Sequence, residues 1–137
     1  MSSQQAALLR PDVVIIEDDT DTLELYALFL KSAGYVVRQA RTGEAGLDIV
    51  RSLKPRLVVT DLTLPDLAGA RLCRSLRAAG APDLAGLIVV TGSADEEMLA
   101  SVRAAGADGI LTKPCLPTDL EAAIRRVLDA AHDAPLG

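Results

Sequence analysis

Short apolar runs rich in β-branched residues alternate along this chain with longer segments in which apolar residues recur at helical spacing. Strands that alternate with helices form βαβ units, whose crossovers are right-handed in nearly all proteins. Nearly continuous apolar runs are typical of parallel strands that helices cover on both faces. The pattern therefore predicts an α/β fold with a doubly wound, five-stranded parallel sheet. The predicted strands are residues 13–16, 35–37, 57–60, 87–90 and 109–112.

Helical segments accompany these strands, and three of them carry an apolar stripe at the spacing i, i+3, i+4 and i+7 that packs onto a sheet. Two further helical segments are residues 70–79 and 95–105. Glycine follows three of the helices, at Gly34, Gly80 and Gly106, so we expect a left-handed residue at each of these helix ends. The stripes are Leu23, Tyr26, Ala27 and Leu30; Gly46, Ile49, Val50 and Leu53; and Leu120, Ala123, Ile124 and Val127.

The length of 137 residues suits one domain with a hydrophobic core, since 50% of the residues are hydrophobic and 24% are charged. The sequence shows no internal repeat. We expect residues 1–11 to form a flexible lead, residues 12–131 to form the folded domain, and residues 132–137 to form a tail.

The charge balance of the chain argues against direct binding to nucleic acid. Nineteen acidic residues outnumber fourteen Lys and Arg residues and give a net charge of −5, whereas a protein that neutralises phosphates carries excess positive charge. Only Tyr26, Phe29 and Tyr35 are aromatic, so stacking platforms for single-stranded nucleic acid are scarce. We therefore expect no nucleic-acid partner.

Cysteine use and hydropathy predict a cytoplasmic protein. Cys73 and Cys115 stand far apart in the sequence, which suggests neither a disulfide framework nor a zinc site. No basic leader precedes a long apolar stretch, and no apolar run reaches the roughly 18 residues that a membrane span needs. We therefore expect a chain that neither enters nor crosses a membrane.

Charged and hydroxyl side chains come directly after four of the predicted strands. In an open α/β sheet, ligands bind beyond the carboxyl ends of the strands. Because parallel strands end at the same edge, we expect these side chains to converge on one crevice. In strand order they are Glu17, Asp18 and Asp19, then Asp61, then Thr91, and finally Lys113 with Pro114.

The acids at this edge predict a site for a divalent cation. If Glu17, Asp18 and Asp61 are all ionised, three negative charges share a small crevice, which is costly without a counter-ion. Mg²⁺ prefers hard oxygen ligands, and it uses one or two carboxylates while leaving room for a phosphate oxygen. Mg²⁺ and Lys113 together would neutralise the three charges.

Asp61 is the candidate nucleophile of this crevice. A carboxylate beside Mg²⁺ and Lys113 can take up a phosphoryl group as an acyl phosphate, because the two cations neutralise charge on the transferring oxygens. Thr91 would then donate a hydrogen bond to a phosphoryl oxygen, and the movement of its hydroxyl would report phosphorylation to the surface. These residues predict a switch more than a catalyst.

Four segments of the chain occur in the order and spacing of one known family. They are VVIIEDDTDTLELYALFLKSAGY, VVTDLTLPDLAG, VVTGSAD and LTKPC. Together they resemble the receiver domains of two-component response regulators, the CheY-like superfamily, over residues 12–131. The resemblance implies the flavodoxin-like (βα)5 receiver fold with the strand order 2-1-3-4-5.

The resemblance also implies roles for the residues of the acidic crevice. It matches Asp61 to the phosphorylated aspartate of the family. Glu17 and Asp18 match the acidic pair that binds Mg²⁺ together with that aspartate, and Asp18 is the stronger candidate for direct coordination. Thr63 occupies the position whose backbone carbonyl also binds Mg²⁺.

Further matches concern the response to phosphorylation. Thr91 matches the switch hydroxyl, and Gly92 leaves space above the phosphoryl site. Lys113 matches the lysine that contacts the phosphoryl group, and its peptide bond to Pro114 is typically cis in this family. Ile110 stands where many receivers carry an aromatic switch residue, so a conventional relay from the hydroxyl to an aromatic ring is not expected here.

As a receiver, the chain would take a phosphoryl group from a sensor histidine kinase or a phosphotransfer protein and offer a changed surface to a downstream protein. It would phosphorylate and dephosphorylate itself without turning over an external substrate. The surface that most receivers present to partners would here include Met98, Val102, Ile110 and Leu116. A homodimer is a further association that this class allows.

Three alternatives stay open at this point. A degenerate receiver would act without phosphate as an interaction or dimerisation module, although the complete set of site residues argues against it. A haloacid-dehalogenase-like Mg²⁺ phosphatase also uses an Asp nucleophile after a strand, but it needs a second Asp where Thr63 stands. A flavin-binding electron carrier shares the fold, yet the sequence EDDTDT after the first strand would repel the phosphate of the cofactor.

Overall fold

A parallel sheet in the strand order β2-β1-β3-β4-β5 forms the centre of the computed structural model, which describes residues 10–93 and 95–133. This topology confirms both the five-stranded α/β fold and the strand order. Most of the lead and tail predicted from the sequence, residues 1–9 and 134–137, lies outside the described residues. The strands are β1 (Val13–Ile16), β2 (Val37–Ala40), β3 (Leu57–Asp61), β4 (Gly86–Thr91) and β5 (Gly109–Thr112).

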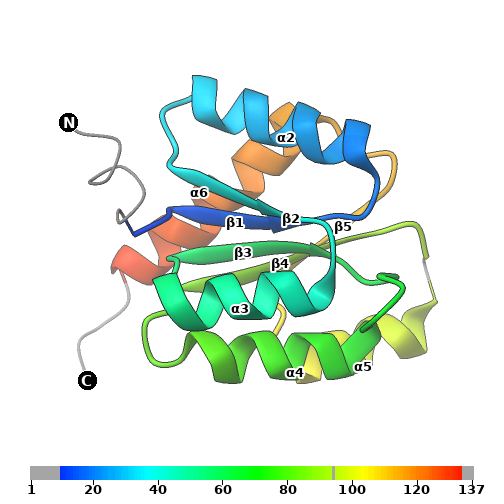
Figure 1. The fold of residues 1–137 in the computed structure, drawn as a ribbon. Helices are drawn as coiled ribbons and strands as arrows, with labels where there is room; N and C mark the ends of the chain where they lie inside the picture. Colours follow the sequence, from blue (N-terminus) through cyan, green and yellow to red (C-terminus); the bar gives the residue numbers. More distant parts are fainter. Residues whose placement is uncertain (1–9, 94, 134–137) are drawn as a thin grey trace.

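Helices cover both faces of this sheet (Figure 1). In the described part of the chain they are α2 (Thr20–Ser32), α3 (Gly43–Leu53), α4 (Gly69–Gly80), α5 (Glu96–Ala104) and α6 (Pro117–Asp133). On one face, α2 and α6 pack around a buried cluster that includes Leu30 and Ile124. On the other face, α3, α4 and α5 pack around a second cluster that includes Leu72 and Val102. The sheet is thus buried between two apolar layers.

The three central strands are buried along their whole length. Every residue of β1, β3 and β4 is buried, which explains why these strands are nearly continuous apolar runs in the sequence. The predicted strands at these places agree with the structure to within one residue at each end. Central burial fixes the position of the loops that follow β1, β3 and β4.

The prediction of a strand at residues 35–37 is wrong, because β2 runs from Val37 to Ala40. β2 is an edge strand that pairs only with β1, and its middle residues Arg38 and Gln39 are exposed. Because these polar residues interrupt the apolar run, the sequence pattern does not indicate a strand here. The amide of Tyr35 still donates to the Leu30 carbonyl at 3.0 Å and so belongs to the end of α2.

Two of the three predicted helix stripes need a correction. In α3 the buried residues are Gly43, Gly46, Leu47 and Val50, whereas the predicted Ile49 and Leu53 are only half-buried. The reason is that Gly46 lies directly on β1, where a Cβ atom would come within 2.3 Å of the Ile16 Cδ1 atom. In α6, Leu128 is buried and the predicted Val127 is half-buried. The α2 stripe is confirmed at all four positions.

Two of the three glycines predicted to end helices in a left-handed conformation do so. Gly34 has φ of +100° and Gly106 has φ of +114°. Gly80 does not, because it is the last residue of α4 and its φ is not positive. Its role is close packing, since a Cβ atom there would lie 2.8 Å from the Leu84 Cβ atom.

No helix within residues 10–93 and 95–133 combines the length and the apolar composition that crossing a bilayer requires.

We expect Leu30→Ala to lower the free energy of unfolding by about 2–5 kcal/mol, since Leu30 is 0% exposed and its loss leaves a cavity. Leu28→Ala is the matched control, because Leu28 is 67% exposed on the same helix and its loss should change stability by less than about 0.5 kcal/mol. Urea denaturation followed by circular dichroism measures both. Equal losses would contradict the assignment of the buried face of α2.

Candidate functional site

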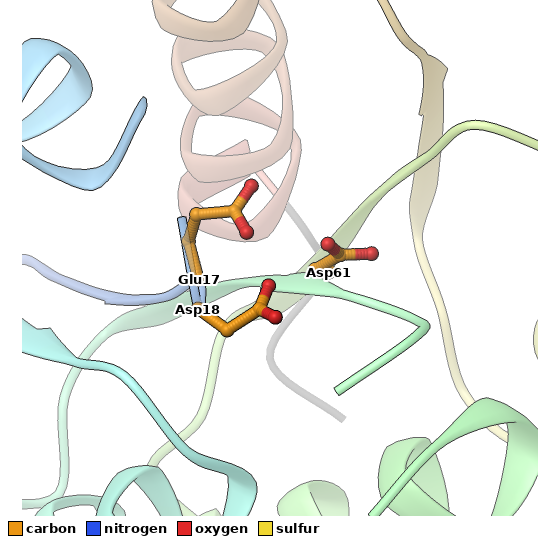
Figure 2. Close-up of side chains that lie close together, drawn as sticks. All are labelled: Glu17, Asp18 and Asp61. Atoms are coloured by element: carbon orange, nitrogen blue, oxygen red, sulfur yellow. The ribbon is translucent and has the colours of Figure 1, made fainter. Parts of the chain in front are cut away.

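Three carboxylates meet where β1 and β3 end at the carboxyl edge of the sheet. Glu17 and Asp18 follow β1 directly, and Asp61 is the last residue of β3. One oxygen from each carboxylate lies within 4.8 Å of the others, and Figure 2 shows the three side chains turned toward one another. Glu17 and Asp61 are only 4% and 5% exposed, whereas Asp18 is exposed. The structure therefore brings together the acids that the sequence singled out.

Lys113 places its ammonium group between two of these acids. The Nζ atom lies 2.9 Å from Glu17 Oε1 and 3.0 Å from Asp61 Oδ2. Lys113 follows β5, and its backbone amide donates to the Thr91 carbonyl at the end of β4 at 2.8 Å. The peptide bond to Pro114 is cis, as the resemblance implied. Lys113 is thus the counter-charge of the acidic cluster.

The loop after β3 is folded back onto Asp61. Asp61 Oδ1 accepts hydrogen bonds from the backbone amide and the hydroxyl of Thr63, each at 3.1 Å. Thr63 forms an isolated antiparallel bridge with Ala68, and the Gly69 amide donates to the Leu62 carbonyl at 3.0 Å. These contacts hold Thr63 beside the end of β3.

Asp66 ties the same loop to α3, a contact that the sequence analysis missed. Its carboxylate accepts hydrogen bonds from the Gly43 and Glu44 amides at 2.9 and 2.8 Å. The two amides belong to the unsatisfied N-terminal groups of α3, and an acid stabilises them by charge as well as by hydrogen bonding. Asp19 caps α2, because its side chain accepts a hydrogen bond from the Thr22 amide at 3.0 Å.

Asp61 and Glu17 respond differently to the same surroundings. Burial raises the pKa of Glu17, and the hydrogen bonds from Lys113 and the Asp19 amide offset this only in part. Burial acts on Asp61 in the same direction, but Lys113 and the two hydrogen bonds from Thr63 outweigh it and hold the pKa of Asp61 below its usual value. Asp61 is therefore the better stabilised anion of the two.

The donor set of the cluster suits a hard divalent cation. Three carboxylates face one ammonium group, so negative charge is in excess although Glu17 and Asp61 are buried. Like charges at this spacing repel strongly unless a counter-ion is bound. Carboxylate oxygens without nitrogen or sulfur donors are the ligands that Mg²⁺ and Ca²⁺ prefer.

The predicted switch residues lie in β4 and β5 and in the segments that directly follow these strands. Thr91 is 0% exposed, and its hydroxyl oxygen accepts a hydrogen bond from the Ser93 amide at 3.1 Å. A Cβ atom on Gly92 would meet no atom within 4 Å, so the space beside Thr91 is open. Ile110 is half-buried against the α3–α4–α5 cluster, and Pro114 is exposed.

One residue of the expected partner surface is misplaced. Val102 is 0% exposed and belongs to the cluster between the sheet and α5, because it lies on the inner face of that helix. Leu116 is exposed, and Met98 and Ile110 are half-buried, so these three residues remain candidates for the surface.

Comparison with known proteins decides the family of this chain. The model of the family "Response regulator receiver domain" matches residues 13–125. The chain belongs to the response regulator receiver family. The match contains every acid of the cluster and Lys113, and the helix after β5 ends just beyond it.

Curated relatives of this receiver are longer proteins. It is 31% identical over 128 residues to the DNA-binding response regulator MtrA of Mycobacterium tuberculosis, which covers 93% of this chain and 54% of MtrA. It is 34% identical over 118 residues to the cell cycle transcriptional regulator CtrA of Caulobacter vibrioides, which covers 85% of this chain and 49% of CtrA. The chain thus spans about half the length of these relatives.

Solved structures of receivers share its fold. A CheY-like receiver domain protein from Methanospirillum hungatei is 32% identical and superimposes with a TM-score of 0.82 over 88% of this chain and 94% of that chain. The receiver domain of a signal transduction histidine kinase from Syntrophus aciditrophicus is 28% identical, with a TM-score of 0.76 over 91% and 95% of the two chains. Receivers of different host proteins therefore resemble this one.

We expect Glu17→Gln to raise the free energy of unfolding of the metal-free receiver at pH 7. The folded state holds a proton on Glu17 more tightly than the unfolded state does, because burial raises the pKa of this group. Protonated Glu17 therefore stabilises the folded state at low pH. This contribution to the free energy of unfolding is lost as the pH rises through the folded-state pKa of Glu17. The gain from glutamine should shrink as the pH falls toward 4.

Urea denaturation between pH 4 and pH 8 measures this difference. Glu24→Gln is the control, because Glu24 is exposed on α2 and its neutralisation should leave stability nearly unchanged at every pH. A destabilising effect of Glu17→Gln at pH 7 would contradict the account of excess negative charge.

Proposed function

We propose that this receiver accepts a phosphoryl group on Asp61 from a sensor histidine kinase or a phosphotransfer protein and thereby switches a protein-binding surface. The observation that carries the proposal is the setting of the Asp61 carboxylate, with one oxygen on Lys113 and the other on Thr63. Receivers as a family are signalling domains. We further propose that the chain acts in the cytoplasm and turns over no external substrate.

Mg²⁺ is the cation that we propose for the acidic cluster. The Glu17, Asp18 and Asp61 carboxylates and the Thr63 backbone carbonyl would hold it, with Asp18 the most accessible of the three acids. Bound Mg²⁺ would neutralise negative charge on the transferring phosphoryl oxygens. The hard oxygen donors and the excess of negative charge support this choice.

In the proposed phosphoryl transfer Asp61 is the nucleophile, and Lys113 stabilises negative charge on the phosphoryl oxygens. One carboxylate oxygen of Asp61 forms a bond to phosphorus while the bond from phosphorus to the imidazole nitrogen of the donor phosphohistidine breaks, and the imidazole leaves. Lys113 already contacts Asp61 Oδ2, so its ammonium group is in place to contact a phosphoryl oxygen without a large movement. A fixed cation of this kind stabilises developing charge at little cost in reorganisation.

Thr91 is the proposed link from the phosphoryl group to the surface. Its hydroxyl now accepts from the Ser93 amide, and a turn toward a phosphoryl oxygen would break that bond. The change would alter the segment before α5 and, with it, the surface of α5, β5 and α6 that includes Met98, Ile110 and Leu116. Ile110 offers no aromatic ring for this movement, so the shift must be carried by backbone and aliphatic packing.

The partners that we propose are proteins. MtrA is named a DNA-binding response regulator, but it is nearly twice as long as the matched region, and the net charge of −5 of this chain does not favour contact with DNA. A downstream protein is therefore the proposed target of the switched surface. A second copy of the chain is a further candidate for the same surface.

We expect one phosphoryl group to be added to the wild-type protein by a small acyl-phosphate donor in the presence of Mg²⁺, and none to Asp61→Asn. Intact-protein mass spectrometry measures the addition. Asp21→Asn is the matched control, because Asp21 is an exposed acid in the first turn of α2 and should not be needed for the addition. EDTA should abolish the reaction.

The outcomes of that experiment separate the alternatives. No addition to any sample would overturn the proposal and favour a receiver that works without phosphate. Addition to Asp61→Asn at the wild-type level would show that another residue is the acceptor.

We expect a beryllium fluoride phosphoryl mimic with Mg²⁺ to change amide hydrogen exchange within residues 92–117, because the switch moves a hydroxyl at the start of this segment. In Thr91→Ala the same change should be at least several-fold smaller, since the moving hydroxyl is absent. Thr60→Ala provides a control for loss of a buried hydroxyl, as Thr60 donates to the Asp61 carbonyl and is 0% exposed. Identical exchange with and without the mimic would count against a switch.

A further inference from the structure

The turn after β5 has to place Lys113 accurately, although β5 is less buried than the central strands. β5 is an edge strand that pairs only with β4, and none of its four residues is buried. The Lys113 ammonium nevertheless reaches both Glu17 Oε1 and Asp61 Oδ2. Packing of the strand alone does not account for such a defined position.

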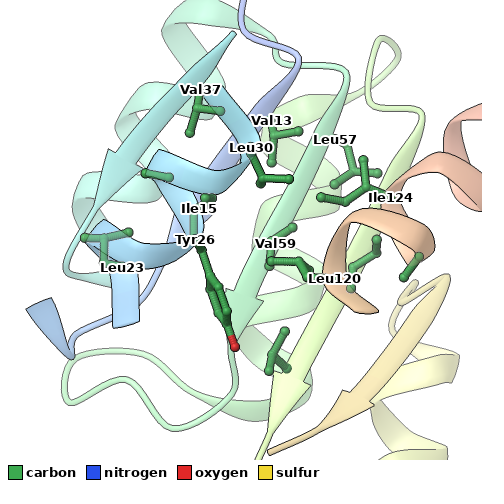
Figure 3. Close-up of a cluster of buried hydrophobic side chains, with 14 of the residues drawn as sticks. Val13, Ile15, Leu23, Tyr26, Leu30, Val37, Leu57, Val59, Leu120 and Ile124 are labelled. Atoms are coloured by element: carbon green, nitrogen blue, oxygen red, sulfur yellow. The ribbon is translucent and has the colours of Figure 1, made fainter. Parts of the chain in front are cut away.

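Tyr26 of α2 supplies a contact to this turn from the other side of the crevice. Its hydroxyl donates a hydrogen bond of 2.8 Å to the backbone carbonyl of Cys115, two residues after Lys113. The ring is 5% exposed and lies in the cluster between the sheet and the pair α2 and α6. Figure 3 shows the ring reaching from α2 along this cluster, with the hydroxyl at its far end.

α2 is also connected to the acids of the site. α2 begins at Thr20, immediately after the acids Glu17, Asp18 and Asp19. The same helix is therefore connected to the acids through the backbone and to the lysine turn through Tyr26. The hydrogen bond therefore links the acids, which come from the N-terminal part of the sequence, to the lysine turn, which comes from the C-terminal part.

The chemistry of both partners suits a lasting contact. Burial raises the pKa of Tyr26 to about 12, so the phenol keeps its proton and remains a donor throughout the neutral range. Cys115 is half-buried with a small side chain, and it packs against the same cluster as the tyrosine ring. A carbonyl that is shielded from water and loses its hydrogen-bond donor is destabilised, so the state in which Tyr26 donates to Cys115 is favoured.

We propose that Tyr26 is a positioning residue that holds the turn from Lys113 to Cys115 and so keeps the Lys113 ammonium between Glu17 and Asp61. The proposal deepens the phosphoryl-transfer function proposed above and rests on it for its consequence in the reaction. Tyr26 acts through Lys113 and needs no contact with the phosphoryl group. The hydrogen bond itself can be tested without any phosphoryl donor.

Tyr26→Phe is the variant to make, because it keeps the buried ring and removes only the hydroxyl. We expect hydrogen exchange of the Lys113 amide, which donates to the Thr91 carbonyl, to become roughly three- to tenfold faster, the size that loss of one ordinary hydrogen bond implies. Tyr35→Phe is the matched control, since Tyr35 is the other tyrosine of the chain and should leave exchange in this turn unchanged.

The second measurement compares reaction rate with metal affinity. In Tyr26→Phe we expect the rate of phosphorylation by a small acyl-phosphate donor to fall roughly three- to tenfold, as the loosened turn implies. The affinity for Mg²⁺ should stay within about twofold of wild type, because the proposed ligands follow β1 and β3 and not β5. A merely structural role of Tyr26 would instead weaken both together.

Unchanged exchange in the turn of Tyr26→Phe would overturn the proposal, and so would an equal fall in phosphorylation rate and Mg²⁺ affinity. The two proposals fail separately. A wild-type protein that takes up no phosphoryl group would refute the proposed function, whereas the exchange experiment would still decide whether Tyr26 holds the turn.

Discussion

The contact of one ammonium group with two buried carboxylates is the interaction on which the rest of this site depends. Lys113 lies 2.9 Å from Glu17 and 3.0 Å from Asp61, and it offsets charge that burial would otherwise make very costly. Burial by itself lowers the pKa of Lys113, but hydrogen bonds to the two acids outweigh it, and the pKa is raised. The lysine is therefore a permanent cation, and with the Asp18 carboxylate included two negative charges are left for a metal ion to balance.

The parallel sheet makes this contact achievable. Residues 17, 61 and 113 are far apart in the sequence, yet each follows a strand that runs in the same direction and ends at the same edge. Buried β1 and β3 fix the acids, while the exposed edge strand β5 needs added support for the lysine.

Sequence reasoning predicted those features that depend on period, order and strand ends. Asp61 and Lys113 could be identified because parallel strands place the residues that follow them at one edge. The contact of Tyr26 with the Cys115 carbonyl could not, since an apolar stripe predicts burial of a ring but not the partner of a hydroxyl 89 residues away. The cap of α3 by Asp66 was hidden for the same reason, because the acid lies in another loop. Polar residues of an edge strand likewise concealed β2.

We propose that the acidic edge is a divalent cation site, whose excess negative charge a bound ion balances. Isothermal titration of the purified protein with Mg²⁺ tests it most directly, with Asp18→Asn as the variant and Asp21→Asn, an exposed acid in the first turn of α2, as the control. We expect saturable binding at one site, weakened at least about tenfold by Asp18→Asn and unchanged by Asp21→Asn. Absence of saturable binding, or equal binding by all three proteins, would contradict it.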